Sequence, residues 1–126
     1  MKRLVAVAIL ASGCTIDPVA RAELAGTVGG AAIFQKAGTS SQVSFEITLE
    51  GEDGTYNVAI EDGVCDGGTT EWKPAGPIDV VGRIGILRGV RTDWDVGGGE
   101  TDVIGRLVVV RRGLAQAGCG PIFNSD

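Results

Sequence analysis

Apolar and polar residues alternate along most of the chain, and this alternation predicts β-strands. The clearest segment is 42–49 (QVSFEITL), where every second residue is apolar and the residues between are polar. Further strands are predicted at 31–34, 56–60, 80–87, 90–96, 103–110 and 118–123. Only the N-terminal segment and 114–116 are candidates for helix. About eight short strands separated by turn residues are typical of an all-β sandwich or Greek-key barrel.

The composition fits one such domain and excludes some partners. The 126 residues include 21 glycines, 44% hydrophobic residues and only 5% aromatics, which predicts an aliphatic core with many tight turns. The formal charge is -5, so the chain lacks the basic surface that nucleic acid requires, and we expect no nucleic-acid partner.

The N-terminus carries the features of an export signal. Lys2 and Arg3 precede an apolar run at 4–11 that is too short to span a bilayer. Small residues then stand directly before Cys14, and this arrangement resembles the lipobox of bacterial lipoproteins. The resemblance implies a signal peptide at 1–13, a lipid anchor on Cys14, a tether at 14–22 and a domain at 23–126. It also implies an envelope location, facing the periplasm or the cell exterior. The alternatives are an ordinary signal peptide cut near Ala11 or Ala20, or a Cys14 that pairs with another cysteine.

Several short motifs follow one another in the order and spacing of Cu,Zn superoxide dismutases. They are 28–34 (VGGAAIF), 63–65 (GVC), 72–74 (WKP), 81–85 (VGRIG), 103–110 (VIGRLVVV) and 118–122 (GCGPI). The resemblance covers about residues 23 to 123 and implies an eight-stranded Greek-key barrel. It also implies a disulfide between Cys65 and Cys119, which suits an exported protein.

The same resemblance places the family's metal ligands on residues that cannot bind copper or zinc as histidine does. The chain has no histidine at all. The copper positions fall on Val58, Ile60 and Arg111, the metal-bridging position on Glu71, and two zinc positions on Val80 and Arg83. We therefore expect no metal, no cofactor and no catalysis. One hypothesis is an ion pair between Glu71 and either Arg83 or Arg111 in place of the metal; the alternative is that these are solvated surface residues.

No other group suggests catalysis. The carboxylates Asp93 and Asp95 flank Trp94 without a predicted substrate cleft, and no hydroxyl has a histidine to activate it. We therefore predict a metal-free, non-catalytic, superoxide dismutase-like envelope lipoprotein that serves as a binding or structural module. Its partner, an envelope protein or a second copy, is not specified by the sequence. The alternative is an enzyme of that family with an unconventional metal site.

Overall fold

The chain folds into eight antiparallel strands, as the alternation predicted. A computed structural model describes residues 19–36 and 42–125, so the predicted signal peptide and Cys14 lie outside the described residues. The strands are β1 (Val19–Gly26), β2 (Gly29–Lys36), β3 (Val43–Glu50), β4 (Gly54–Gly63), β5 (Thr69–Val80), β6 (Ile84–Arg91), β7 (Leu107–Arg112) and β8 (Ala115–Asn124). Within residues 19–36 and 42–125, no helix is long and apolar enough to cross a membrane.

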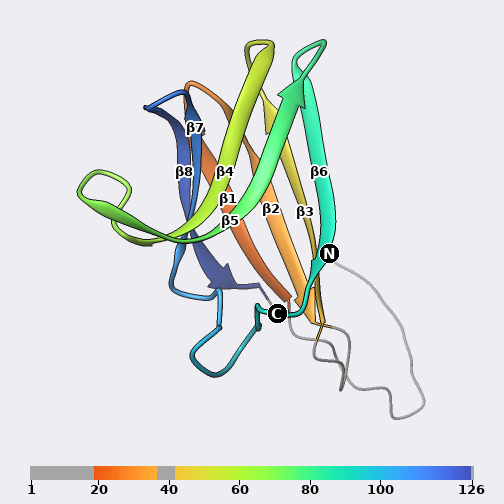
Figure 1. The fold of residues 1–126 in the computed structure, drawn as a ribbon, viewed down its shortest axis with the longest axis vertical. Helices are drawn as coiled ribbons and strands as arrows, with labels where there is room; N and C mark the ends of the chain where they lie inside the picture. Colours follow the sequence, from red (N-terminus) through yellow and green to blue (C-terminus); the bar gives the residue numbers. More distant parts are fainter. Residues whose placement is uncertain (1–18, 37–41, 126) are drawn as a thin grey trace.

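The strands form a nearly closed barrel with the order β5-β4-β7-β8-β1-β2-β3-β6 (Figure 1). Its two end strands, β5 and β6, meet at the hairpin that joins them, where Val81 pairs with Ile84. Gly85 allows this close approach, because a Cβ there would stand 2.6 Å from the carbonyl oxygen of Asp79. Farther along, the Arg91 guanidinium donates to the carbonyl of Pro74 at 2.8 Å and links the two strands again.

One core fills the barrel. The alternation predicted in β3 is confirmed, because Val43, Ile47 and Leu49 are fully buried and Phe45 nearly so. All strands except β6 contribute buried hydrophobic side chains to this core, and Leu87 of β6 is partly buried against them; the buried cluster runs from Ala20 to Ile122. The described residues therefore form one continuous core.

The strand boundaries differ from the predictions at five places, and one of them is the predicted strand at 103–110, which begins only at Leu107 as β7. β1 begins at Val19, so the last residues of the predicted tether belong to the barrel. The predicted strand at 80–87 is divided by the turn between β5 and β6, and 114–116 forms a turn and the start of β8 rather than a helix. The predicted strand at 90–96 is wrong beyond Arg91, because Trp94 and Val96 alternate as in a strand but lie in an irregular segment that closes one end of the core.

Trp94 anchors this irregular segment, 92–106. Its ring packs on Phe34 and Phe45, with ring centroids 5.8 and 5.1 Å apart, and Arg91 lies over its other side at 4.7 Å. Its indole N–H is buried without a hydrogen-bond partner. The apolar contacts of the ring thus fix the segment at the cost of one unsatisfied donor.

The predicted disulfide between Cys65 and Cys119 is present, with Cα atoms 5.8 Å apart. It joins the loop between β4 and β5 to the outer face of β8. There Cys119 packs with Leu107 and Val109 of β7 in a small second cluster outside the barrel. The ends of β4 and β5 and the loop between them, residues 61–73, project from the barrel and are called the β4–β5 arm (Figure 1). The disulfide therefore holds this arm against the barrel.

Removing this disulfide should weaken the fold strongly. The bond closes a sequence separation of 54 residues, and replacing both cysteines by serine should lower the free energy of unfolding by about 4 kcal/mol in the loop-entropy model. Urea unfolding of the chain from Thr15 onward measures this. Added reductant should destabilise the wild type and leave the Cys65→Ser/Cys119→Ser variant unchanged. A loss below about 1 kcal/mol would contradict the proposed hold on the arm.

Candidate functional site

The positions that the resemblance assigns to metal ligands do not gather in one place. Val58 and Ile60 of β4 and Val80 of β5 are buried in the core. Glu71 and Arg111 instead border a hollow of about 260 Å³ on the outer face of β4, β5 and β7, together with Asn57, Val58, Ala59, Pro74, Gly76 and Gly113. The residues of β4 whose side chains share that outer face are Asn57, Ala59 and Glu61, one position away from the assigned pair.

Arg83 does not border this hollow and lies in the turn between β5 and β6. It is exposed and adopts a left-handed backbone with φ of 74°. The carboxylate of Asp53 accepts hydrogen bonds from the backbone N–H groups of Gly82 and Arg83, at 3.2 and 2.9 Å. The hypothesis of a Glu71–Arg83 ion pair is therefore wrong: Arg83 helps to form a turn capped by Asp53.

Arg111 does form an ion pair, but its partner is Glu61, which the sequence analysis did not single out. Glu61 is 1% exposed and is the only buried charged residue among those described. Nη1 of Arg111 bonds one carboxylate oxygen of Glu61, and Nη2 donates to the other at 3.1 Å. Nη2 also donates to the hydroxyl oxygen of Thr69 at 3.2 Å. Both carboxylate oxygens of the buried group are thus satisfied.

Irregularities in the strands accompany this pair. The β4–β5 register shifts between Val58 and Ala59 and again between Ile60 and Glu61, and the β7–β8 register shifts between Val110 and Arg111. Each β4–β5 shift leaves one residue of β5 unpaired, and those residues, Ala75 and Trp72, pack against the core. Bulges of this kind bend a strand and re-aim its side chains.

The pair changes the ionisation of both partners. The hydrogen bond from Arg111 lowers the pKa of Glu61 below its ordinary value, against the effect of burial, and Thr69 lowers it further. The hydrogen bond to Glu61 in turn raises the pKa of Arg111, and the nearby charge of Glu71 adds to this. Glu71 lies directly across from Glu61 in the β4–β5 ladder. One guanidinium therefore offsets two facing carboxylates.

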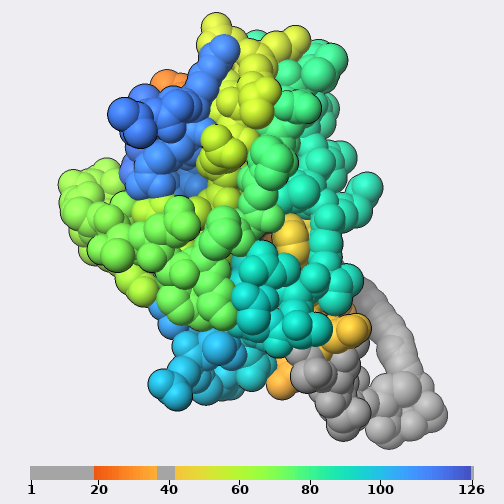
Figure 2. Space-filling model, viewed as in Figure 1, coloured from red at the N-terminus to blue at the C-terminus, as the bar shows by residue number. Residues whose placement is uncertain are grey.

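A second arginine joins the arm to the irregular segment. Nη1 of Arg106 donates to both carboxylate oxygens of Asp62, at 2.6 and 2.8 Å, and its guanidinium lies 3.7 Å from the ring centroid of Trp72. The same side chain donates to the carbonyls of Asp102 and Glu100 at 2.9 and 3.0 Å. Figure 2 shows the green arm of β5 packed directly on this segment.

The carboxylates beside Trp94 also have structural partners. Arg91 donates to both oxygens of Asp93 at 3.0 Å, and Lys36 pairs with Asp95 at 3.0 Å. These hydrogen bonds lower the pKa of each carboxyl group, against the effect of burial. A general acid in glycoside hydrolysis needs a raised pKa instead. Both groups are therefore set up as anions that hold the segment in place.

Loss of the Glu61 charge should destabilise the protein in a pH-dependent way. Glu61→Gln leaves Arg111 without its partner and should lower the free energy of unfolding by about 2 kcal/mol at pH 7, a value reduced because Arg111 is partly exposed. Because the folded pKa lies below the ordinary 4.5, the contribution is complete above that pH. It is lost as the pH falls through the folded pKa, so the two proteins should converge in acid.

Denaturant unfolding at a series of pH values measures this difference. Glu23→Gln is the matched control, because the Arg21–Glu23 pair is exposed, with side chains 41% and 61% accessible. Its effect should stay below about 1 kcal/mol. Equal effects of the two substitutions, or a constant difference across the pH series, would contradict the assigned role of Glu61.

Comparison with known proteins supports the fold. No family model matches the chain, and no curated protein matches it. Among solved structures, the chain is similar to the clock protein EA4, with a TM-score of 0.67 over 90% of this chain and 99% of that chain. The two sequences are 16% identical, a level at which a shared fold carries no activity with it. The likeness thus extends over the whole barrel and concerns its architecture alone.

Proposed function

We propose that the protein is a metal-free, non-catalytic barrel of the superoxide dismutase type that serves as a binding or structural module at the bacterial envelope. The observation that carries this proposal is the bond between Arg111 and buried Glu61. The family resemblance implies a copper ligand at the position of Arg111. A guanidinium stays protonated in proteins and has no lone pair to offer a metal.

The residues around the hollow fit a stabilising role better than a metal site. Among the described residues, no three histidine, cysteine, aspartate or glutamate side chains are grouped so that they can hold a metal. Glu61 is committed to Arg111, and Cys65 and Cys119 are joined to each other. The fixed cation of Arg111 would also repel a divalent ion bound at Glu71. The barrel would therefore serve as a stable scaffold, and its exposed surface would make the contacts with a partner.

The proposal predicts that copper and zinc do not bind in stoichiometric amounts. The oxidised chain from Thr15 onward would be loaded with each metal, desalted and weighed by native mass spectrometry, with superoxide turnover assayed on the same sample. The expected result is no bound metal and no turnover above buffer. One metal per chain together with turnover would favour the alternative, an enzyme with an unconventional site, and would overturn the proposal.

The envelope location rests on the lipobox-like residues before Cys14, and it has its own test. Full-length protein produced in a bacterium should incorporate labelled palmitate and fractionate with membranes. Cys14→Ser should abolish the label and release the barrel in soluble form, with the Cys65–Cys119 disulfide retained. Labelling that persists in the variant, or a wild type that carries no label, would contradict the anchor.

A further inference from the structure

The outer surface of β3 and β6 carries an unusual set of side chains for a free surface. Ile84, Ile86 and Val90 of β6 are 53%, 48% and 57% exposed, and Val81 in the adjoining turn is 75% exposed. Their neighbours on β3 are Glu50, Thr48 and Ser44, which lie directly across in the ladder, and Arg88 lies across from Glu46. We call these eight residues of the two strands, with Val81, the β3–β6 face.

The β3–β6 face is regular along its whole length. β6 pairs with β3 through eight consecutive positions without a shift in register. Three of the four side chains that β6 projects outward, Ile84, Ile86 and Val90, are branched and apolar, and Arg88 is the fourth. Contiguous exposed apolar side chains that are rimmed by polar residues are typical of an interface.

The central charges of this face neutralise each other, although the whole chain carries a net charge of -5. Glu46 pairs with Arg88 at 2.5 Å, and the two residues lie directly across from each other in the ladder. At the rim, Glu50 borders a small hollow together with Arg83 and Ile84, and the Asp53 carboxylate caps the same turn. A second copy can therefore set an arginine against a glutamate at the centre of the contact, where neither charge faces one of its own sign.

We propose that the β3–β6 face is a homodimer interface. Its two-fold axis lies between the two packed faces, runs parallel to β3 and β6, and passes over the midline between these two strands. This symmetry lays β6 of one copy over β3 of the other, at the usual spacing of packed sheets of about 10 Å. Arg88 then faces Glu46 of the second copy, and Glu46 faces its Arg88, so that each exposed pair becomes part of a four-charge network. Ile86 lies over Thr48 of the second copy on both sides of the axis.

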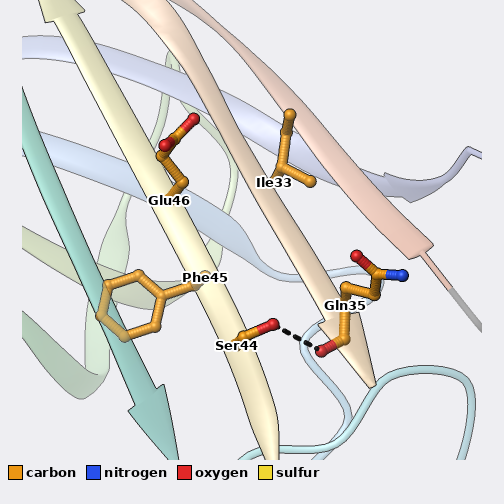
Figure 3. A pocket seen from close by; sticks show the side chains of 5 residues that line it. All are labelled: Ile33, Gln35, Ser44, Phe45 and Glu46. Atoms are coloured by element: carbon orange, nitrogen blue, oxygen red, sulfur yellow. Dashed lines mark hydrogen bonds between the residues drawn. The ribbon is translucent and has the colours of Figure 1, made fainter. Parts of the chain in front are cut away.

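The neighbouring surface on β2 can extend the contact. Ile33 lies directly across from Glu46 in the β2–β3 ladder and is half-buried. Ile33, Gln35, Ser44, Phe45 and Glu46 border a shallow hollow there, where the Ser44 hydroxyl donates to the Gln35 carbonyl at 3.3 Å (Figure 3). This inference does not depend on the proposed function, because the face lies outside the Glu61–Arg111 site.

Sedimentation equilibrium of the chain from Thr15 onward, which contains all eight strands described, tests the interface. The wild type should be dimeric at about 100 μM, a concentration at which a micromolar Kd gives mostly dimer. Ile86→Glu should raise the Kd of the dimer at least about tenfold, because each copy then buries one new carboxylate in the interface. Val64→Glu is the matched control, since Val64 is 62% exposed on the β4–β5 arm, and it should leave the Kd unchanged.

Charge reversal then tests the symmetry itself. Glu46→Arg and Arg88→Glu each place like charges across the axis, so each variant alone should be monomeric. Both should keep their fold, because the pair they break is exposed and contributes at most about 1 kcal/mol. Mixed together, the two variants should form a heterodimer, detected by native mass spectrometry, because the two arginines of one copy then face the two glutamates of the other.

Three outcomes would overturn the proposal. A wild type that is monomeric at this concentration excludes the dimer. An Ile86→Glu variant that dimerises as the wild type does places the interface elsewhere. A mixture of the two reversed variants that stays monomeric, when the wild type is a dimer, excludes the proposed axis.

Discussion

The outer face of the second half of the barrel depends on one constraint: the Glu61 carboxylate is buried and must be matched. A carboxylate without a partner in such a place would cost several kcal/mol or take up a proton. Arg111 supplies two hydrogen bonds and Thr69 contributes another. The three residues come from β4, β7 and β5, so the match is made only when these strands pair in the observed register. The ion pair thus links local ionisation to the arrangement of three strands.

The β4–β5 arm is held to the barrel at several points that do not require a metal. The disulfide fixes the loop to β8, and the side chain of Gln116 donates to the Cys65 carbonyl at 3.2 Å. Arg106 joins the arm to segment 92–106 through Asp62 and Trp72. The ion pair lies between these points. Covalent, electrostatic and stacking contacts therefore together restrain the β4–β5 arm, which has few buried apolar residues of its own.

The part of this structure that follows from local pattern was predictable. The alternation in β3 predicted which of its side chains point into the core. The resemblance to superoxide dismutases predicted the disulfide between Cys65 and Cys119, which is present. The importance of Glu61 was not predictable, because alternation after Ile60 places it on the outer face, where a carboxylate is normally solvated. Its burial depends on Arg111, which lies 50 positions away in the sequence. A signal existed, however: a glutamate at the end of an apolar strand and an arginine directly after Val108-Val109-Val110.

Long-range effects also explain the other differences. The two shifts in the β4–β5 register cannot be read from the sequence, and they decide which residues of β5 reach the core. Trp94 and Val96 alternate as strand residues do, but the end of the barrel needs apolar side chains to cover it, and an irregular segment supplies them. The pattern identified buried residues correctly there and assigned them the wrong backbone.

A double-mutant cycle on Glu61 and Arg111 tests the central claim that a buried ion pair organises this face. Free energies of unfolding would be measured for the wild type, Glu61→Gln, Arg111→Gln and the double variant, with the same cycle on the exposed Arg21–Glu23 pair for comparison. The account predicts a coupling energy above about 1.5 kcal/mol for Glu61 and Arg111, and below about 0.5 kcal/mol for the exposed pair. Equal coupling in the two cycles would contradict it.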